Sequence, residues 1–234
     1  MITTMARTLR TTANILESVG ARRRLRSAPS DVEGAFDFIS SFAYGDLRAA
    51  PLQVREEMVS LLETLRGLRP RSIVELGTAR GGTLFLFTRV AAADACIVTV
   101  DLKGAAFGGG YPLAHAPFFR SFARERQTIR LVHGDTHSAE TFERVRTAVG
   151  GPVDFLFIDA DHTYEGVRRD FEMYSPLVRS GGWIAFHDIV EGPPEAVGGV
   201  PRFWGELRSR LGEAEEIVAD PQQGGYGIGL IQKD

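Results

Sequence analysis

From residue 51 onward, short apolar segments alternate with longer segments whose apolar residues recur every three or four positions. The first pattern is typical of buried strands and the second of amphipathic helices. Strands that alternate with helices form a mostly parallel sheet covered by helices on both faces. We therefore predict an α/β fold with a doubly wound, mostly parallel seven-stranded sheet and an N-terminal helical extension.

The boundaries follow from the apolar runs and from the turn residues between them. The expected strands are Ser72–Leu76, Cys96–Val100, Ile129–Val132, Val153–Ile158, Trp183–Phe186, Glu216–Ala219 and Ile228–Gln232. The expected helices are one that starts near Pro51 and is ended by Gly67 and Pro70, then Gly82–Ala93, Pro117–Glu125, Ala139–Val149, Tyr164–Val178 and Pro201–Leu211. The last two strands have no helical pattern between them, which predicts an antiparallel hairpin at the C-terminal end.

We divide the chain into an N-terminal helical arm, residues 1–50, and one α/β domain, residues 51–234. The arm is rich in arginine, with Arg22, Arg23, Arg24 and Arg26 close together. Such a cluster can bind an anionic partner or a membrane surface, but charge runs are more often a solvated helix face. We favour a solvated arm that packs on a second subunit, and hence a homo-oligomer.

Composition excludes several classes of protein. The net charge of −3 gives no general reason to expect nucleic-acid binding. The single cysteine, Cys96, allows no internal disulfide and fits a reducing compartment. No apolar run reaches the roughly 18 residues of a transmembrane helix, and the first 20 residues lack the apolar core of a secretory signal. We expect a cytoplasmic protein without a transmembrane segment.

The first strand runs into a glycine-rich turn, VELGTARGGTL. In an open parallel sheet, ligands bind beyond the carboxyl ends of the strands. Gly77 follows the strand directly, where a side chain would block a ligand, while Gly81 and Gly82 let the next helix start close to the turn. Glu75 is an acid near the end of a buried strand, a costly position unless it has a partner.

Polar residues also end the next two strands. Asp101 lies 24 residues after Gly77, and Asp135 and Thr136 follow the third strand. An acid at the end of the second strand can accept hydrogen bonds from both ribose hydroxyls of a nucleoside. Simple turn chemistry is the alternative. The turn does not have the G-x-G-x-x-G spacing that cradles a pyrophosphate, so we expect a nucleoside ligand without one.

Acids follow the fourth and fifth strands, at Asp159 in FIDADH and at Asp188 in AFHDI. If these strands are neighbours, the two carboxylates meet and can hold a hard divalent cation such as Mg²⁺. Helix capping is the alternative for either acid. For Asp161, a cap for the helix from Tyr164 is at least as good an interpretation as a role in the site.

The ordered motifs ELGTARGGT, VDLKG, HGDTH and FIDADH resemble those of class I S-adenosylmethionine-dependent methyltransferases, over about residues 51–232. The stretch from FIDADH to FHDI, followed by GGVPRFWGEL, is similar to the metal-dependent subgroup of macrolide-sugar O-methyltransferases and cephalosporin-hydroxylase-like proteins. The resemblance implies a Rossmann-like fold and O-methylation of a small-molecule hydroxyl, first a sugar on a natural product or glycolipid, next a phenol or catechol. The cofactor-binding residues it implies are Glu75, Gly77, Thr78, Gly81, Gly82, Asp101, Asp135 and Thr136.

The same resemblance suggests roles in the reaction. Asp159 and Asp188 would bind the divalent metal, and His162, at the offset where similar sugar O-methyltransferases place a histidine, would be the base. His187 stands where relatives commonly have an acid; since imidazole suits softer metals, it either binds such a metal, contacts substrate or points aside. The loop 104–118 would close over the substrate, with plain loop packing an equal alternative for Tyr111, His115 and Phe118; His133 and His137 receive no role.

Two other function classes stay open. One is a nicotinamide-dependent oxidoreductase on a similar sheet, which the missing G-x-G-x-x-G disfavours. The other is a protein that binds S-adenosylmethionine without catalysis, which the presence of Asp159, His162 and Asp188 disfavours.

Overall fold

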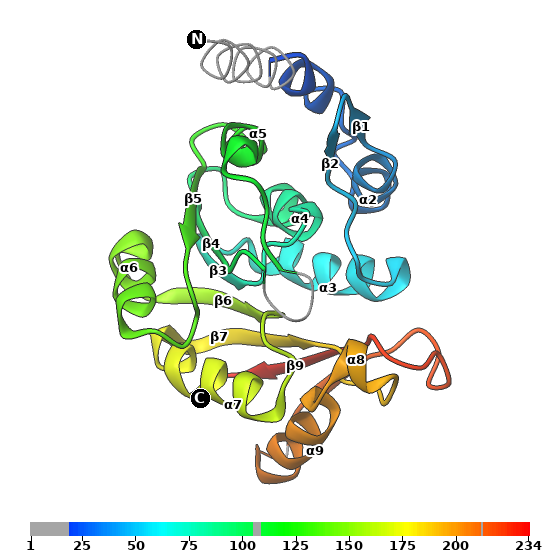
Figure 1. The fold of residues 1–234 in the computed structure, drawn as a ribbon, viewed down its shortest axis with the longest axis vertical. Helices are drawn as coiled ribbons and strands as arrows, with labels where there is room; N and C mark the ends of the chain where they lie inside the picture. Colours follow the sequence, from blue (N-terminus) through cyan, green and yellow to red (C-terminus); the bar gives the residue numbers. More distant parts are fainter. Residues whose placement is uncertain (1–18, 105–108, 212) are drawn as a thin grey trace, which may run out of the picture.

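The computed structural model describes residues 19–104, 109–211 and 213–234, and a seven-stranded sheet forms the middle of the molecule (Figure 1). The strands are β3 (Ser72–Leu76), β4 (Cys96–Asp101), β5 (Thr128–His133), β6 (Val153–Ile158), β7 (Val178–His187), β8 (Glu215–Ile217) and β9 (Ile228–Gln232). Their order across the sheet is β5-β4-β3-β6-β7-β9-β8. Strands β3 to β7 run parallel, and β9 is antiparallel to both β7 and β8. The predicted fold class and the C-terminal hairpin are confirmed.

Helices cover both faces of the sheet (Figure 1). One face carries α2 (Val32–Ser40), α3 (Arg55–Leu68), α4 (Gly82–Val90) and α5 (Ala116–Arg120), together with a hairpin of β1 (Ala43–Tyr44) and β2 (Leu47–Arg48). The other face carries α6 (Ala139–Val149), α7 (Tyr164–Tyr174) and α9 (Val200–Leu211). Short helical turns are Leu113–His115, Ser175–Leu177 and α8 (Pro194–Val197), and residues 19–25 are helical.

Alternation along the strands creates two hydrophobic cores, one on each face of the sheet. In β3, Ile73 belongs to the core under α2 to α5, and its neighbour Val74 belongs to the core under α6, α7 and α9. The same holds in β6 for Phe155 and Leu156. Successive side chains of a strand point to opposite faces, so these continuous apolar runs require a sheet that is buried on both sides, as the sequence predicted.

The segment before residue 51 shares one of these cores. Val32, Phe36, Ile39 and Phe42 are buried in the same cluster as the side chains of α3, α4 and α5. The ring of Phe42 stacks on that of Phe118, with 5.6 Å between the ring centroids. The hydrophobic core therefore continues across residue 50.

Most predicted elements are confirmed, with shifts at their ends. The prediction that Gly67 ends the first long helix is wrong, because α3 runs on to Leu68 and Arg69 takes the left-handed conformation, with φ of 47°, that closes it. The helix predicted over Pro117–Glu125 is also too long, since α5 ends at Arg120. The hairpin β1–β2 was not predicted, because its strands have only two residues each.

The chain reverses its direction of winding at β3, since β4 and β5 lie on one side of this strand and β6 on the other. Ligands of open α/β sheets bind at such a point. The backbone N–H of Asp159 donates to the carbonyl of Leu76 at 2.9 Å, and that of Gly77 donates to the carbonyl of Val100, also at 2.9 Å. Gly77 has φ of 99°, and a Cβ there would lie 1.9 Å from the Asp159 carbonyl oxygen. Only glycine lets β6 end so close to the turn.

Candidate active site

A cavity of about 590 Å³ opens at the carboxyl ends of the parallel strands. This volume falls within the range of about 300–1,000 Å³ that is common for ligand pockets. The turns after β3, β4, β5, β6 and β7 all contribute to its wall, joined by α8 and the loop before β9. The site residues named from the sequence that line it are Gly77, Asp101, Asp135, Thr136, Asp159, His162, His187 and Asp188.

Four of the predicted cofactor-binding residues do not line this cavity. Thr78 is buried, and its hydroxyl lies 2.5 Å from that of Thr99. A Cβ on Gly81 would lie 2.8 Å from the ring of Phe119, and one on Gly82 would lie 2.3 Å from the backbone nitrogen of Pro51. These glycines therefore serve the packing of α4 against its neighbours.

Glu75, the fourth, is fully buried within the sheet. Its Oε2 accepts a hydrogen bond from the Thr99 hydroxyl at 2.5 Å, while its Oε1 has no hydrogen-bond partner among the described residues. Burial raises the pKa of this carboxyl to about 8, and the nearby charges of Asp159 and Asp101 act in the same direction. At neutral pH, Glu75 is therefore mostly protonated and can donate a hydrogen bond.

Asp101 ends β4 at the wall of the cavity. One carboxylate oxygen accepts a hydrogen bond from the backbone N–H of Ala79 at 2.6 Å. Burial raises the pKa of Asp101, against the effect of the backbone hydrogen bonds that its carboxylate accepts. The contact ties the turn after β3 to the end of β4, so two of the predicted cofactor segments share one wall of the cavity.

Two acids and two histidines converge at the ends of β6 and β7, in the wall of the same cavity. Oδ1 of Asp159 lies 3.3 Å from Nε2 of His162 and 3.3 Å from Nδ1 of His187. Oδ2 of Asp188 lies 3.4 Å from Nδ1 of His162 and 3.3 Å from Nδ1 of His187. Strands β6 and β7 are parallel neighbours, so the prediction that Asp159 and Asp188 meet follows from their positions just past the strand ends.

The backbone of Asp188 adopts a left-handed conformation, with φ of 63°, which is uncommon for a residue other than glycine. His187 is buried beside it, and its Nε2 has no hydrogen-bond partner among the described residues. His162 donates from Nδ1 to the carbonyl of Ala196 at 2.6 Å. This contact fixes the tautomer of the neutral ring, so Nε2 is the atom of His162 that would accept a proton.

Charge pairing decides the protonation of this cluster. Burial opposes ionisation of Asp159, but the charges and hydrogen bonds of His187 and His162 outweigh it and hold the carboxyl pKa well below its usual range. Burial also opposes protonation of the histidines, but the pull of Asp159 and Asp188 raises the pKa of His162 to about 9 and that of His187 to about 10. In this arrangement both rings are protonated on both nitrogens and positively charged at neutral pH.

The donor set fits a divalent cation. Asp159, His162 and Asp188 each offer one ligand atom, and these atoms lie within 4.8 Å of one another. Two carboxylates beside open cavity space suit Mg²⁺, which keeps several waters, whereas an added imidazole suits zinc or iron better. Nδ1 of His187 faces the same two carboxylates, so it could serve as a ligand only after losing its proton.

Gln53, which the sequence analysis did not identify, binds the carboxylate oxygen of Asp159 that does not face the two histidines. Its amide nitrogen donates to Oδ2 of Asp159 at 2.9 Å, and its amide oxygen accepts from the Thr83 hydroxyl at 2.9 Å. Gln53 is buried just before α3 and lines the cavity. No local pattern could have identified it, because 106 residues separate it from Asp159.

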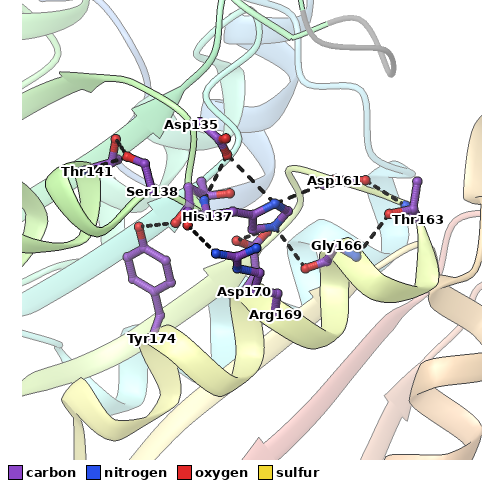
Figure 2. Close-up of polar contacts among 11 residues, drawn as sticks. Asp135, His137, Ser138, Thr141, Asp161, Thr163, Gly166, Arg169, Asp170 and Tyr174 are labelled. Carbon is purple, nitrogen blue, oxygen red and sulfur yellow. Dashed lines mark hydrogen bonds and ion pairs between the residues drawn. The ribbon is translucent and has the colours of Figure 1, made fainter.

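His137, to which the sequence assigned no role, lines the cavity between three acids (Figure 2). Its Nε2 lies 3.3 Å from Oδ1 of Asp170, a fully buried acid of α7, and 3.1 Å from the carbonyl oxygen of Gly166. Its Nδ1 lies 3.8 Å from Asp135 and 4.0 Å from Asp161. The nearby carboxylate of Asp170 raises the pKa of His137. The ring thus links the turn after β5 to the first turn of α7.

Asp161 does not act as the N-cap of α7. That position belongs to Thr163, whose hydroxyl accepts from the N–H of Gly166 at 3.0 Å. Asp161 accepts from the N–H of Thr163 at 2.9 Å and so shapes the turn before the cap. Asp161 lines the cavity, but its contact in the turn indicates a structural role rather than a role in the reaction.

The residues predicted to close over the substrate are partly packed elsewhere. Phe118 is fully buried in the core. Tyr111 is buried against Phe119 and His133, with ring centroids 4.7 Å and 4.6 Å away. Residues 105–108 of this predicted loop lie outside the described residues. Packing is therefore the better account of Tyr111 and Phe118.

Residues 74–189 match a protein-family model described as a methyltransferase domain. An uncharacterized protein of Sinorhizobium fredii, y4gI, is 32% identical over 148 residues, which are 61% of this chain and 16% of that protein. The uncharacterized protein R132 of Acanthamoeba polyphaga mimivirus is 50% identical over 36 residues. The chain spans 16% of the length of each of these two relatives.

Solved structures share the fold. An O-methyltransferase from Bacillus cereus, solved with SAH, superposes with a TM-score of 0.60 at 21% identity, covering 88% of this chain and 91% of that one. The O-methyltransferase TomG from Streptomyces achromogenes, solved with SAM, gives 0.58 at 20% identity, with 90% of both chains covered. The segment that matches the family model runs from within β3 to just past β7 and so contains the strand ends that build the cavity.

Proposed function

We propose that this chain is an S-adenosylmethionine-dependent O-methyltransferase that acts on a hydroxyl group of a small molecule. The observation that carries the proposal is that one cavity joins the glycine turn and Asp101 to the cluster of Asp159, His162 and Asp188. The family match supports methyl transfer, and similar folds solved with SAM or SAH support the cofactor.

The cofactor would lie along the turns after β3, β4 and β5. In this proposal Gly77 faces the methionine part, Asp101 accepts hydrogen bonds from the ribose, and Asp135 and Thr136 lie near the adenine. All four residues line the cavity. Glu75, Thr78, Gly81 and Gly82 would shape this region from behind, because the cavity does not reach their side chains or Cα atoms.

Asp159 and Asp188 would hold a divalent cation, with Mg²⁺ as the first candidate and His187 as a third ligand if the metal is softer. Bound there, the cation would lower the pKa of a substrate hydroxyl. Gln53 would keep Asp159 turned toward the cavity. The sulfonium methyl is already electrophilic, so the remaining task of the protein is to align the hydroxyl with it.

His162 would be the general base, with Nε2 as the accepting atom. The pairing with Asp159 keeps a proton on this ring in the structure. A divalent cation held by Asp159 and Asp188 would weaken that pairing and lower the pKa of His162 toward neutrality. A histidine that ligates the metal through Nε2 cannot also be the base, so these two roles exclude one another.

The substrate class rests on the resemblance of FIDADH and the following residues to sugar O-methyltransferases. A sugar hydroxyl on a natural product or glycolipid is the first candidate, and a phenol or catechol is the second. No helix within the described part of the chain combines the length and apolar character needed to cross a membrane. A cytoplasmic location and a homo-oligomer stay proposals.

The test begins with calorimetry of S-adenosylmethionine against NAD. Binding of NAD alone would contradict the proposal. In a methylation assay with sugar and catechol acceptors, His162→Ala should lower kcat by about 10²–10⁴-fold, the usual contribution of a general base, with S-adenosylmethionine affinity kept. An unchanged kcat would remove His162 as base. Retained binding of Mg²⁺ or Zn²⁺ by His162→Ala would separate the base role from a ligand role.

A further inference from the structure

A second cavity, of about 560 Å³, is lined by helical residues from 19–25 and by residues at the end of α5, and it is distinct from the cavity at the carboxyl ends of the strands. Among the described residues, one acid, Glu125, and five arginines line it: Arg22, Arg26, Arg89, Arg120 and Arg124. A neighbouring cavity of about 320 Å³ shares Arg89, Arg124 and Glu125 and adds Arg66 and Arg69. The chain as a whole carries a net charge of −3, so this concentration of positive charge is local.

The arginines of the larger cavity differ in their partners from other arginines of the described residues. Elsewhere, arginines form ion pairs, such as Arg55 with Asp37 at 2.7 Å and Arg146 with Glu143 at 2.6 Å. Among the described residues, none of the five arginines that line the larger cavity is within ion-pair distance of a carboxylate. A concave surface with walls of one sign concentrates its field on a ligand of the opposite sign.

Two of these arginines are also partly removed from water. Arg89 and Arg124 are half-buried. Arg89 is held in place, since its Nη2 donates to the Phe122 carbonyl at 2.8 Å and its guanidinium lies 4.2 Å from the centre of the Phe85 ring. Burial, and then the charge of Arg124, lower the pKa of Arg89 to about 9. An anion in the cavity would relieve both effects.

The cavity wall joins segments that are distant in sequence. Arg22 donates from Nη2 to the Pro117 carbonyl at 3.2 Å, which ties the helical residues 19–25 to α5. Arg120 and Arg124 follow from the end of α5, and Arg89 comes from α4. The arginine cluster of the N-terminal segment thus faces a second cluster across the cavity rather than only bulk solvent.

We propose that this cavity is a binding site for a phosphate-type oxyanion, carried either by a soluble phosphate compound or by a lipid headgroup. Guanidinium groups pair with phosphate oxygens through two parallel hydrogen bonds, and several around one cavity favour a ligand with more than one negative charge. The site shares no lining residue with the cavity at the strand ends. It is therefore separate from the proposed methyl-transfer site and does not rest on that function.

The test uses the full chain and inorganic pyrophosphate as the probe, titrated by calorimetry at low and at physiological salt. The variant Arg120→Gln/Arg124→Gln removes two charges whose side chains make no hydrogen bond among the described residues. The matched control is Arg126→Gln. Arg126 is exposed, lies two residues after Arg124 and lines neither cavity. We expect wild type and the control to bind alike, and the double variant to bind at least about tenfold more weakly.

A second arm separates the two sources of phosphate. Sedimentation with phosphatidylglycerol vesicles, compared with phosphatidylcholine vesicles, should show binding that pyrophosphate displaces if the ligand is a headgroup. Pyrophosphate binding without vesicle binding would assign the site to a soluble phosphate compound. The proposal is overturned if wild type binds neither probe, or if the double variant and Arg126→Gln lose affinity equally. A circular dichroism spectrum and a thermal unfolding transition equal to those of the wild type confirm that the double variant is folded.

Discussion

At the scale of single residues, Gln53 holds a carboxylate of the proposed metal site in place. Its amide fixes Oδ2 of Asp159 and is itself fixed by Thr83. Partners that orient a metal ligand typically contribute about 10–100-fold to metal affinity. We therefore expect Gln53→Leu to weaken Mn²⁺ or Mg²⁺ binding by about this factor, as measured by calorimetry.

The matched control for Gln53→Leu is Gln222→Leu, since Gln222 is exposed and its side chain makes no hydrogen bond among the described residues. It should bind metal as wild type does. Equal metal affinity in Gln53→Leu and wild type would show that Gln53 does not orient Asp159. If Gln53→Leu lost both its metal binding and the circular dichroism spectrum of the folded protein, the cause would be unfolding instead.

His137 gives a prediction about pH. Its pKa is raised by Asp170, so its proton is bound more tightly in the folded protein than in the unfolded chain. The stabilisation is then complete below the unfolded pKa of about 6.5 and is lost as pH rises through the higher folded value. We expect the free energy of unfolding to fall above pH about 6.5 in wild type, and Asp170→Asn to show a shallower fall.

NMR titration of the His137 ring would measure the underlying shift directly. Asp135 and Asp161 also face the ring, and the Gly166 carbonyl pairs with its Nε2, so the shift should shrink in Asp170→Asn without vanishing. Glu172→Gln, on the exposed side of the same helix, is the control and should leave the titration unchanged. A His137 pKa that is equal in wild type and Asp170→Asn would refute the pairing.

Residues at the ends of strands were predictable and those that support them were not. Asp159 and Asp188 each follow an apolar run, and parallel strands bring their ends to one edge. Gln53 and His137 lie in loops, where no period places a side chain. Gly81 and Gly82 were assigned to the cofactor, but the structure shows that close packing on Phe119 and Pro51 already requires them.

At the scale of elements, α3 binds the loop between β8 and β9 through hydrogen bonds and so positions it at the active-site cavity. Glu57 of α3 is buried, with 1% exposure, and accepts from the N–H groups of Ala219 and Gly227 at 3.1 and 2.9 Å and from Gln223 at 2.6 Å. The loop between these residues contributes Gly224 and Tyr226 to the active-site cavity. One acid thus holds a wall of the cavity from behind.

Glu57→Leu should destabilise the protein by about 3 kcal/mol, because it leaves two backbone donors without their acceptor. Chemical denaturation measures this change. Glu57→Gln retains an acceptor oxygen and should restore part of the stability. Glu56→Leu, at an exposed position of the same turn, should change the free energy of unfolding by less than about 0.5 kcal/mol. A loss from Glu57→Leu no larger than that from Glu56→Leu would disprove the anchoring role.

Element types followed from periodicity, whereas element ends depended on contacts. Ser72–Leu76, Val153–Ile158 and Ile228–Gln232 match their predicted bounds, since each is an apolar run flanked by turn residues. Gly67 was expected to end α3, but the backbone of Arg69 supplies the left-handed turn that does so. Local sequence ranks glycine first for that conformation and cannot show that a later residue adopts it.

At the scale of the whole molecule, the doubly wound sheet was predicted from the sequence, but the core that continues across residue 50 was not. The alternation of strands and helices predicts a doubly wound sheet, and ligand binding at its reversal point follows. The division at residue 50 rested on charge and composition. In the structure, Phe36, Ile39 and Phe42 from before that point are buried with α4 and α5.

This shared core predicts how a shortened chain behaves. Each large apolar side chain that is buried contributes about 1.5–3 kcal/mol, and the net stability of a domain is only about 5–15 kcal/mol. Removing residues 1–50 takes away the partners of Phe85 and Phe118, whose rings stack on Phe38 and Phe42. We therefore expect the chain 51–234 to lose cooperative unfolding and to expose apolar surface, seen by calorimetry and dye binding. A cooperative transition within about 5 °C of the full chain would instead mean that residues 51–234 form an independent domain.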